Sequence, residues 1–246
     1  MSDTALVCLD RIIDDVVEAA RARRLAVEAR ADNFQSPFEA AGDPKRFWAP
    51  GVTLRVCFLD GAAGLRQRVL AAASTWTDHA NLTFAPTDDP AAEIRVTFDL
   101  GVSQSLVGTD CRTAKPGEPT MALALLAGSP DLSVTLHARH EFGHALGLVH
   151  EHQNPAEGIQ WNKDEVYRAM AGPPNHWDRP TVDRNYFERY GRDTYKFTEF
   201  DPDSVMLYAV PKAWTLDRRS FKTNSELSAL DRTFIADAYP GRAATV

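Results

Sequence analysis

Five of the chain's seven histidines lie between positions 137 and 152, and His140, His144 and His150 have spacings that suit a single metal ion. In a helix, residues four apart lie one above the other on the same face, so His140 and His144 can direct their rings at the same ion. Gly147 can adopt the left-handed conformation that ends a helix, which would bring His150 back as a third ligand. Three protein ligands leave one position of a tetrahedral zinc ion open, as in catalytic rather than structural sites.

Glu141 directly follows the first of these histidines. It is rotated by about 100° from His140 around the helix axis, so we expect its carboxylate to reach a water on the ion rather than the ion itself. A carboxylate in that place can act as a general base. A buried helix with merely hydrogen-bonded histidines is the alternative, but the spacing of four matching residues favours the metal site.

Two further histidines flank the candidate ligands. His137 is one helical turn before His140 and could compete as a ligand. We expect it to be a polar neighbour instead, because the other three histidines already complete a site. His152 is expected to lie beside the ligands or to be exposed.

The stretch from His140 to Glu151 resembles the zinc-binding motif of the metzincin peptidases, and the segment that follows is most similar to that of the astacin branch. The sequence Ser204-Val205-Met206-Leu207-Tyr208 resembles the methionine-containing turn under the zinc in this family. Leu207 stands where astacins usually have histidine. The order of elements is similar over about residues 47–240.

The resemblance implies an α+β fold of the zincin/metzincin type. A twisted mixed N-terminal sheet would carry a backing helix and the zinc-site helix, and a smaller irregular C-terminal subdomain would end in a helix. The implied activity is that of a zinc-dependent endopeptidase with one catalytic Zn²⁺ and Glu141 as general base. A protein or peptide substrate would lie in a cleft between residues 47–150 and 151–246.

The resemblance also assigns expected roles to three other residues. Met206 would be a hydrophobic floor under the zinc and not a ligand. Glu151 would form a structural salt bridge. Tyr208 would bind zinc at rest and donate a hydrogen bond to the oxyanion during catalysis. A sheet edge would pair with the extended substrate, and by position we expect residues 120–125 to form that edge.

Two other functions remain open. A zinc-site protein could bind a peptide or partner without cleaving it, and a zinc hydrolase could act on a non-peptide bond. An intact Glu141 favours catalysis over binding alone.

Composition limits the class of protein. At 246 residues with 44% hydrophobic residues, the chain can bury the core of one ordinary domain. A net charge of −7 disfavours nucleic acid as a partner. No apolar run is long enough to span a bilayer, and residues 1–10 lack the features of a secretory signal. Cys8, Cys57 and Cys111 are too few and too scattered for a disulfide framework. These features favour a cytoplasmic protein unless a signal has been removed or export is non-classical. The sequence leaves the oligomeric state open, with a monomer favoured.

The N-terminal 46 residues are expected to be separate from the catalytic domain at 47–246. Residues 9–30 have the spacing of an amphipathic helix, and residues 31–46 contain prolines and glycines typical of a linker. The helix either packs on the domain or belongs to a pro-segment that covers the cleft. Gly42-Asp43 is similar to part of the zinc-blocking motif of astacin pro-segments, and Cys8 could block zinc as a thiolate, although a buried apolar role is simpler.

Hydrophobic periodicity predicts the remaining elements. Val134, Ala138, Phe142 and Ala145 form the core stripe of the zinc-site helix, which begins after Pro130 with Asp131 or Ser133 as its cap. The predicted strands are 52–59, 82–85, 93–98, 105–108 and 120–126, and the other predicted helices are 65–79, 163–170, 181–190 and 226–239.

Overall fold

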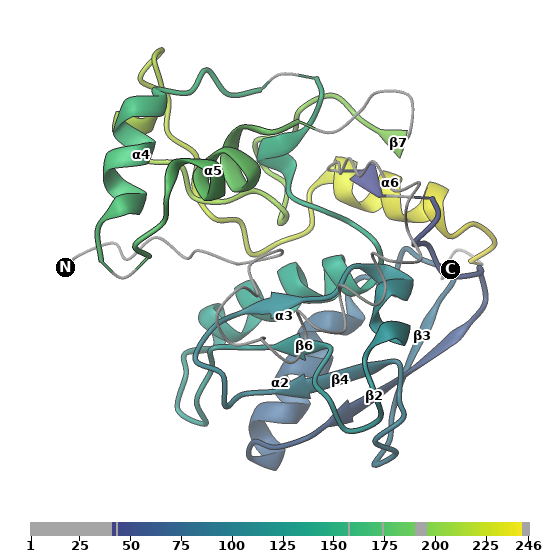
Figure 1. Ribbon diagram of the computed structural model, residues 1–246. Helices are drawn as coiled ribbons and strands as arrows, with labels where there is room; N and C mark the ends of the chain where they lie inside the picture. Colours follow the sequence, from purple (N-terminus) through teal and green to yellow (C-terminus); the bar gives the residue numbers. More distant parts are fainter. Residues whose placement is uncertain (1–40, 43, 157, 174, 190–195, 243–246) are drawn as a thin grey trace.

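The structure is a computed structural model that describes residues 41–42, 44–156, 158–173, 175–189 and 196–242. In Figure 1 a sheet and two helices fill the lower half of the view, and an irregular portion with shorter helices lies above them. The helices are α2 (Ala63–Ser74), α3 (Asp131–Ala145), α4 (Lys163–Ala171), α5 (Arg179–Val182) and α6 (Ala229–Ala238). This arrangement confirms the predicted α+β fold, with a regular N-terminal portion and an irregular C-terminal one.

The sheet has five strands in the order β3-β2-β4-β6-β5. The first four run parallel, and the last pairs antiparallel with its neighbour, so the sheet is mixed as predicted. Its central strand β4 has all four residues buried, which is typical of a parallel strand covered on both faces. The strands are β2 (Thr53–Phe58), β3 (Thr83–Pro86), β4 (Ile94–Thr97), β5 (Gln104–Ser105) and β6 (Met121–Ala122).

The prediction that residues 120–125 form the sheet edge is wrong. In β6, Met121 is paired with Val96 on one side and with Ser105 on the other, so this strand is internal. The edge on this side of the sheet is β5, which overlaps the predicted strand at 105–108 only at Ser105.

Helix α2 backs the sheet and ends at Ser74, five residues before the predicted end. Trp76 follows in a turn and is fully buried, and its indole N–H donates to the carbonyl of Arg139 in α3 at 2.8 Å. This bond joins the backing helix to the zinc-site helix.

The zinc-site helix α3 begins after Pro130 as predicted, but its N-cap is Pro130 itself, without a side-chain cap. Asp131 lies inside the first turn and pairs with Arg68 at 2.6 Å instead of capping the helix. The predicted core stripe is confirmed, since Val134, Ala138, Phe142 and Ala145 are all buried.

The C-terminal portion has a core of its own, built largely from aromatic rings around Tyr186, Tyr208 and Trp214. The predicted helix 181–190 is a single turn, α5, followed by the π-helical turn η3 (Asp183–Phe187). Helix α6 begins at Ala229 because Ser228 caps it. The short elements are η1 (Gly108–Thr113), η2 (Glu151–Gln153), η4 (Lys212–Trp214) and the paired strands β1 (Ala41–Gly42) and β7 (Lys196–Phe197).

The predicted helix at 9–30, Cys8 and Asp43 lie outside the described residues. The boundary near residue 47 stays a prediction. Arg46 pairs with Asp110 at 2.9 Å, so the last residues before this boundary already contact the sheet-bearing portion. None of the described helices is both long and apolar enough to cross a membrane.

Candidate active site

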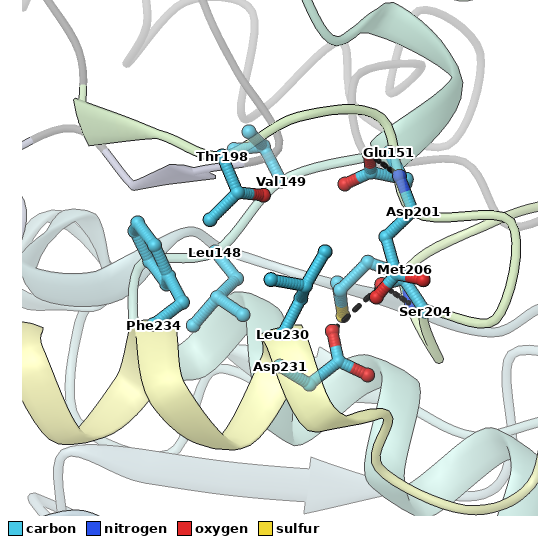
Figure 2. A pocket seen from close by; sticks show the side chains of 10 residues that line it. All are labelled: Leu148, Val149, Glu151, Thr198, Asp201, Ser204, Met206, Leu230, Asp231 and Phe234. Atoms are coloured by element: carbon cyan, nitrogen blue, oxygen red, sulfur yellow. Dashed lines mark hydrogen bonds between the residues drawn. The ribbon is translucent and has the colours of Figure 1, made fainter. Parts of the chain in front are cut away.

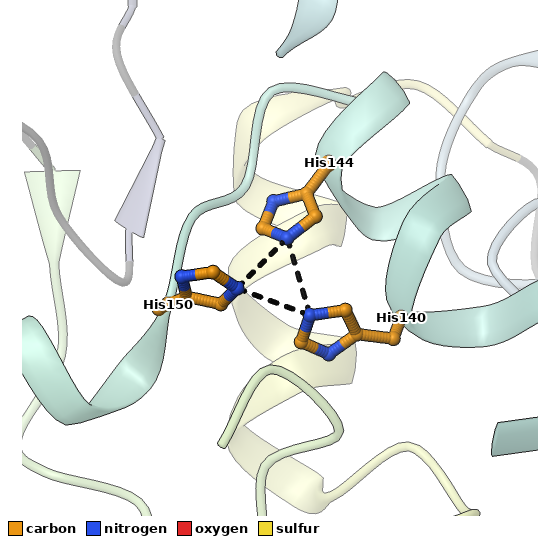
Figure 3. A group of neighbouring side chains, drawn as sticks. All are labelled: His140, His144 and His150. Carbon is orange, nitrogen blue, oxygen red and sulfur yellow. Dashed lines mark hydrogen bonds between the residues drawn. The ribbon is translucent and has the colours of Figure 1, made fainter. Parts of the chain in front are cut away.

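Three histidine rings converge at the junction of the two portions (Figure 3). The Nε2 atoms of His140 and His150 are 3.2 Å apart, those of His144 and His140 are 3.2 Å apart, and those of His144 and His150 are 3.1 Å apart. All three side chains are buried, and they form a group that could hold one metal ion. Ligands about 2.0–2.1 Å from a tetrahedral zinc ion are roughly 3.3 Å apart, so the observed triangle fits such an ion.

The outward-facing nitrogens of two rings fix which nitrogen carries the proton. His140 Nδ1 is 2.8 Å from the carbonyl oxygen of Val205, and His144 Nδ1 is 2.9 Å from that of Leu148. A carbonyl oxygen can only accept, so both Nδ1 atoms carry the hydrogen and both Nε2 atoms present lone pairs. Lone pairs directed at one point repel each other unless a cation lies between them, and this donor set therefore fits a metal ion.

The end of α3 brings His150 back to the other two rings. Gly147 has φ +94°, the left-handed conformation expected of it. The N–H of Leu148 donates to the carbonyl of Gly143 at 3.0 Å, and that of Gly147 donates to His144 at 2.7 Å. These two bonds form a Schellman motif, which ends the helix and reverses the chain.

Gly147 also permits a close approach from the N-terminal side. A Cβ at this position would lie 2.7 Å from Cδ1 of Phe47. Glycine is therefore needed here for both the backbone conformation and the space.

The turn at residues 204–208 lies against the zinc-site helix. A Cβ at Gly143 would be 2.5 Å from the sulfur of Met206, so the absence of a side chain at 143 lets the methionine pack against α3. Met206 is buried. Its carbonyl accepts from the N–H of Glu151 at 3.0 Å, which ties the turn to the segment that carries His150.

Glu141 lies on α3 directly after His140, with 1% of its side chain exposed. Almost no glutamate is buried to this extent without a structural or chemical reason. The structure thus brings the predicted base and the three predicted ligands together in one interior region.

The ring of Tyr208 lies beside two of the histidines. Its centroid is 4.2 Å from that of His150 and 6.0 Å from that of His140. His152 also stacks on Tyr208, with centroids 4.5 Å apart and ring planes 25° from parallel, and its Nε2–H donates to the carbonyl of Asn185 at 2.7 Å. His152 is therefore a buried neighbour of the site and not an exposed side chain.

His137 does not join the three-histidine group among the described residues. Its Nδ1 is 2.5 Å from Oγ of Ser103, which also accepts from the N–H of Ala124 at 3.0 Å. Burial lowers the pKa of His137. His137 is thus a polar neighbour of the site, as expected, and it connects α3 to the loop before the edge strand β5.

Glu151 lines a small internal cavity of about 20 Å³ together with Asp201 and Asp231 (Figure 2). Its Oε1 accepts from Asn154 Nδ2 at 2.9 Å and from the N–H of Asp201 at 2.8 Å. Burial raises the pKa of this carboxyl well above its usual range. Within the described residues its partners are these neutral groups, and the family's salt bridge stays an expectation.

Several residues that hold the site were not identified from the sequence. The carbonyls of Val205 and Leu148 carry no signal in their residue types, because every residue has a backbone carbonyl. Asp231 did have a signal, since Ser228 followed three residues later by an acidic side chain is a helix-capping pattern.

Comparisons with known proteins agree with this geometry. No model of a known protein family matches the sequence. The zinc metalloproteinase nas-23 of Caenorhabditis elegans is 24% identical over 214 residues, which are 85% of this chain and 33% of that protein. The chain thus spans about a third of the length of this curated relative.

Solved structures are also similar. A structure of myroilysin is 35% identical with a TM-score of 0.79, covering 82% of this chain and 100% of that chain. High choriolytic enzyme 1, a hatching enzyme zinc-protease from the medaka fish Oryzias latipes, has the same fold at 18% identity and a TM-score of 0.54, covering 83% and 98% of the two chains.

The three-imidazole donor set could hold one metal ion and fits a single zinc ion, and the curated relative is named a zinc metalloproteinase. Together the motif, the fold and these similarities show that the chain belongs to the astacin-like metzincin family of zinc metallopeptidases.

Proposed function

We propose that the chain is an endopeptidase in which Glu141 is the general base. The observation that carries this proposal is the convergence of three Nε2 atoms within 3.2 Å of one another, with a buried glutamate directly after the first ligand. A three-nitrogen donor set leaves room at the ion for water or substrate.

Zinc bound by the three histidines would act as a Lewis acid and lower the pKa of water at the site. The carboxylate of Glu141 would accept a proton from the attacking water and then deliver it to the nitrogen of the leaving amine. The carbonyls of Val205 and Leu148 would keep His140 and His144 in the orientation that this reaction needs.

Tyr208 is proposed as the donor of a hydrogen bond to the oxyanion. The nearness of its ring to His140 and His150 supports this role. A positioned donor of this kind is worth about 2.7–4 kcal/mol to a tetrahedral transition state. The alternative is a tyrosine that only packs beneath the zinc, with its hydroxyl on a backbone group.

The substrate is proposed to be an extended peptide that adds to the sheet at β5. Two observations support this position. β5 is the edge strand of the sheet, and it packs against α3, which carries the first two ligands. An exposed edge offers backbone donors and acceptors to any extended chain. The acidic net charge of −7 makes nucleic acid a poor partner.

The test is digestion of a library of protein-derived peptides by the zinc-loaded chain, with panels of ester and non-peptide amide substrates in parallel. Glu141→Gln keeps the shape of the side chain and removes the base, so zinc should stay while turnover falls by roughly 10²–10⁴ or more. Cleavage restricted to the non-peptide panels would make the chain a different zinc hydrolase. Peptide binding without any cleavage would make it a binding protein.

A further inference from the structure

The first turn of α6 meets the turn at residues 204–206, although more than 20 residues separate them along the chain. Asp231 in α6 is the contact between them. Its Oδ1 accepts from the hydroxyl of Ser204 at 2.7 Å, and its Oδ2 accepts from the N–H of Val205 at 3.0 Å. Figure 2 shows the carboxylate of Asp231 beside Ser204, below the cavity. One buried carboxylate thus holds two consecutive residues of the turn.

The same carboxylate is part of the helix cap. Oδ2 of Asp231 also accepts from the N–H of Ser228 at 3.0 Å, and Oγ of Ser228 accepts from the N–H of Asp231 at 2.8 Å. This reciprocal capping box fixes where the carboxylate lies relative to the helix. Asp231 is therefore held by α6 while it holds the turn.

The turn passes this constraint on to the zinc ligands. The carbonyl of Val205, whose N–H binds Asp231, accepts Nδ1–H of His140 at 2.8 Å. One residue later, the carbonyl of Met206 accepts from the N–H of Glu151 at 3.0 Å. The turn thus bonds directly to the ligand His140, and it also bonds to Glu151, the residue that follows the ligand His150.

We propose that Asp231 is a positioning residue for zinc binding, which fixes the turn so that the carbonyl of Val205 orients the ring of His140. The path runs from Asp231 to Val205 and from Val205 to His140, over two hydrogen bonds of ordinary length. The proposal concerns how tightly the metal is held, and it stands whether or not the chain cleaves peptides.

The residue type follows from the number of donors. Three donors face Asp231, namely a hydroxyl and two backbone N–H groups, and only an ionised carboxylate offers acceptors on both oxygens. An asparagine of the same size would turn an NH₂ group toward one of these donors. That donor would be left buried without an acceptor, and the turn would move to relieve it.

The experiment compares Asp231→Asn with Ser228→Ala in the full chain, and zinc alone is the probe. Each change alters one member of the capping box, but only Asp231→Asn alters a side chain that bonds to the turn. We expect Asp231→Asn to weaken zinc binding by roughly 10–100-fold, measured by competition with a chromophoric chelator, because groups that orient metal ligands have effects of that size. Ser228→Ala should lower the thermal unfolding midpoint but leave the zinc affinity within about twofold. Its lost hydroxyl bonds to the N–H of Asp231 and to Oδ2 of Asp201, not to residues 204–206, and the backbone N–H of residue 228 still donates to Oδ2 of Asp231.

A second readout reports on His140 itself. In ¹⁵N spectra of the zinc-loaded protein, the Nδ1–H signal of His140 should exchange faster with solvent in Asp231→Asn than in Ser228→Ala. Ser204→Ala removes one of the two bonds from Asp231 to the turn, together with the bond from Met206 N–H to the same hydroxyl, and it decides the question if Asp231→Asn does not fold. It should weaken zinc binding to a smaller extent and accelerate the same exchange.

Equal zinc affinities in Asp231→Asn and Ser228→Ala, at equal loss of thermal stability, would overturn the proposal. The proposal would also be overturned if Ser204→Ala had the same zinc affinity and the same His140 Nδ1–H exchange rate as the unmodified chain.

Discussion

The two portions of the molecule supply the site in different ways. The N-terminal portion supplies His140, His144 and Glu141 from α3, a helix whose opposite stripe is buried against Trp76, Phe84 and the sheet. Helical periodicity sets the positions of these three residues, and the large apolar core fixes the helix.

His150, Met206 and Tyr208 come from segments with little regular structure, namely the loop after α3 and the turn at residues 204–208 of the C-terminal portion. They are held by single hydrogen bonds, such as that from Glu151 N–H to the carbonyl of Met206 at 3.0 Å, and by packed aromatic rings. The half of the site on α3 thus depends on a helix and the core beneath it. The other half depends on a small number of polar contacts that join distant parts of the chain.

The largest effect should come from removing a ligand on the regular side. His144→Ala deletes one of three donors to the ion and should abolish both zinc retention and activity. His137→Ala is the matched control, because His137 lies on the same helix and bonds to Ser103 instead. Elemental analysis after gel filtration should find zinc in the control but not in His144→Ala. Zinc retained by His144→Ala and lost from His137→Ala would exchange the roles of these two histidines.

The next effect tests whether the core beneath α3 carries its stability. Phe142 is fully buried and meets Phe84 with ring centroids 5.1 Å apart. Phe142→Ala should lower the free energy of unfolding by about 3–5 kcal/mol, measured by denaturant titration of the zinc-free protein. Leu132→Ala, on the same helix but 62% exposed, should change it by less than about 0.5 kcal/mol. Similar values for the two variants would contradict the assigned core face.

A third change tests the irregular side. Tyr208→Phe removes only the hydroxyl, so zinc affinity should change little while turnover falls by roughly tenfold to a thousandfold. Steady-state kinetics on one peptide substrate measures this. Turnover within about twofold of the unmodified chain would leave Tyr208 as a residue that only packs against His150 and His152.

The smallest effect concerns the glycine that ends α3, and it tests whether Gly147 is needed for space as well as for backbone conformation. Gly147→Ala and Gly117→Ala both place a side chain at positive φ, +94° and +80° respectively. Each should lose about 1–2 kcal/mol of stability through backbone strain. Only Gly147→Ala adds a clash, because its Cβ would lie 2.7 Å from Phe47 while that of Gly117 has no atom within 4 Å. A thermal midpoint for Gly147→Ala no lower than that for Gly117→Ala would show that Phe47 moves aside freely.

The predictability of the fold follows the same division. The helix that carries His140, and the core stripe from Val134 to Ala145, followed from spacing alone because a helix repeats the same geometry at every turn. The strands with alternating apolar residues were placed to within a few residues. The predicted strand at 105–108 overlaps β5 only at Ser105, and the edge was wrongly assigned to residues 120–125, because strand order depends on pairings between distant segments.

The site was predicted where residue types are chemically distinctive. Histidine, glutamate and the turn-forming Gly147 have few alternative explanations at these spacings. The contacts that orient them were not predicted. The carbonyls of Val205 and Leu148 cannot be recognised from residue type, because every residue has a backbone carbonyl. Asp231 contacts the turn only because α6 packs against it in the folded chain, and the sequence does not show that packing.

The most direct test of the account is the position of zinc in crystals of the metal-loaded chain, measured by anomalous scattering at the zinc absorption edge. We predict a single strong peak, roughly 2.0–2.1 Å from Nε2 of His140, His144 and His150, with Glu141 close by but not bound to the ion. A peak on His137 or His152, or the absence of any peak among the three converging rings in fully loaded protein, would contradict it.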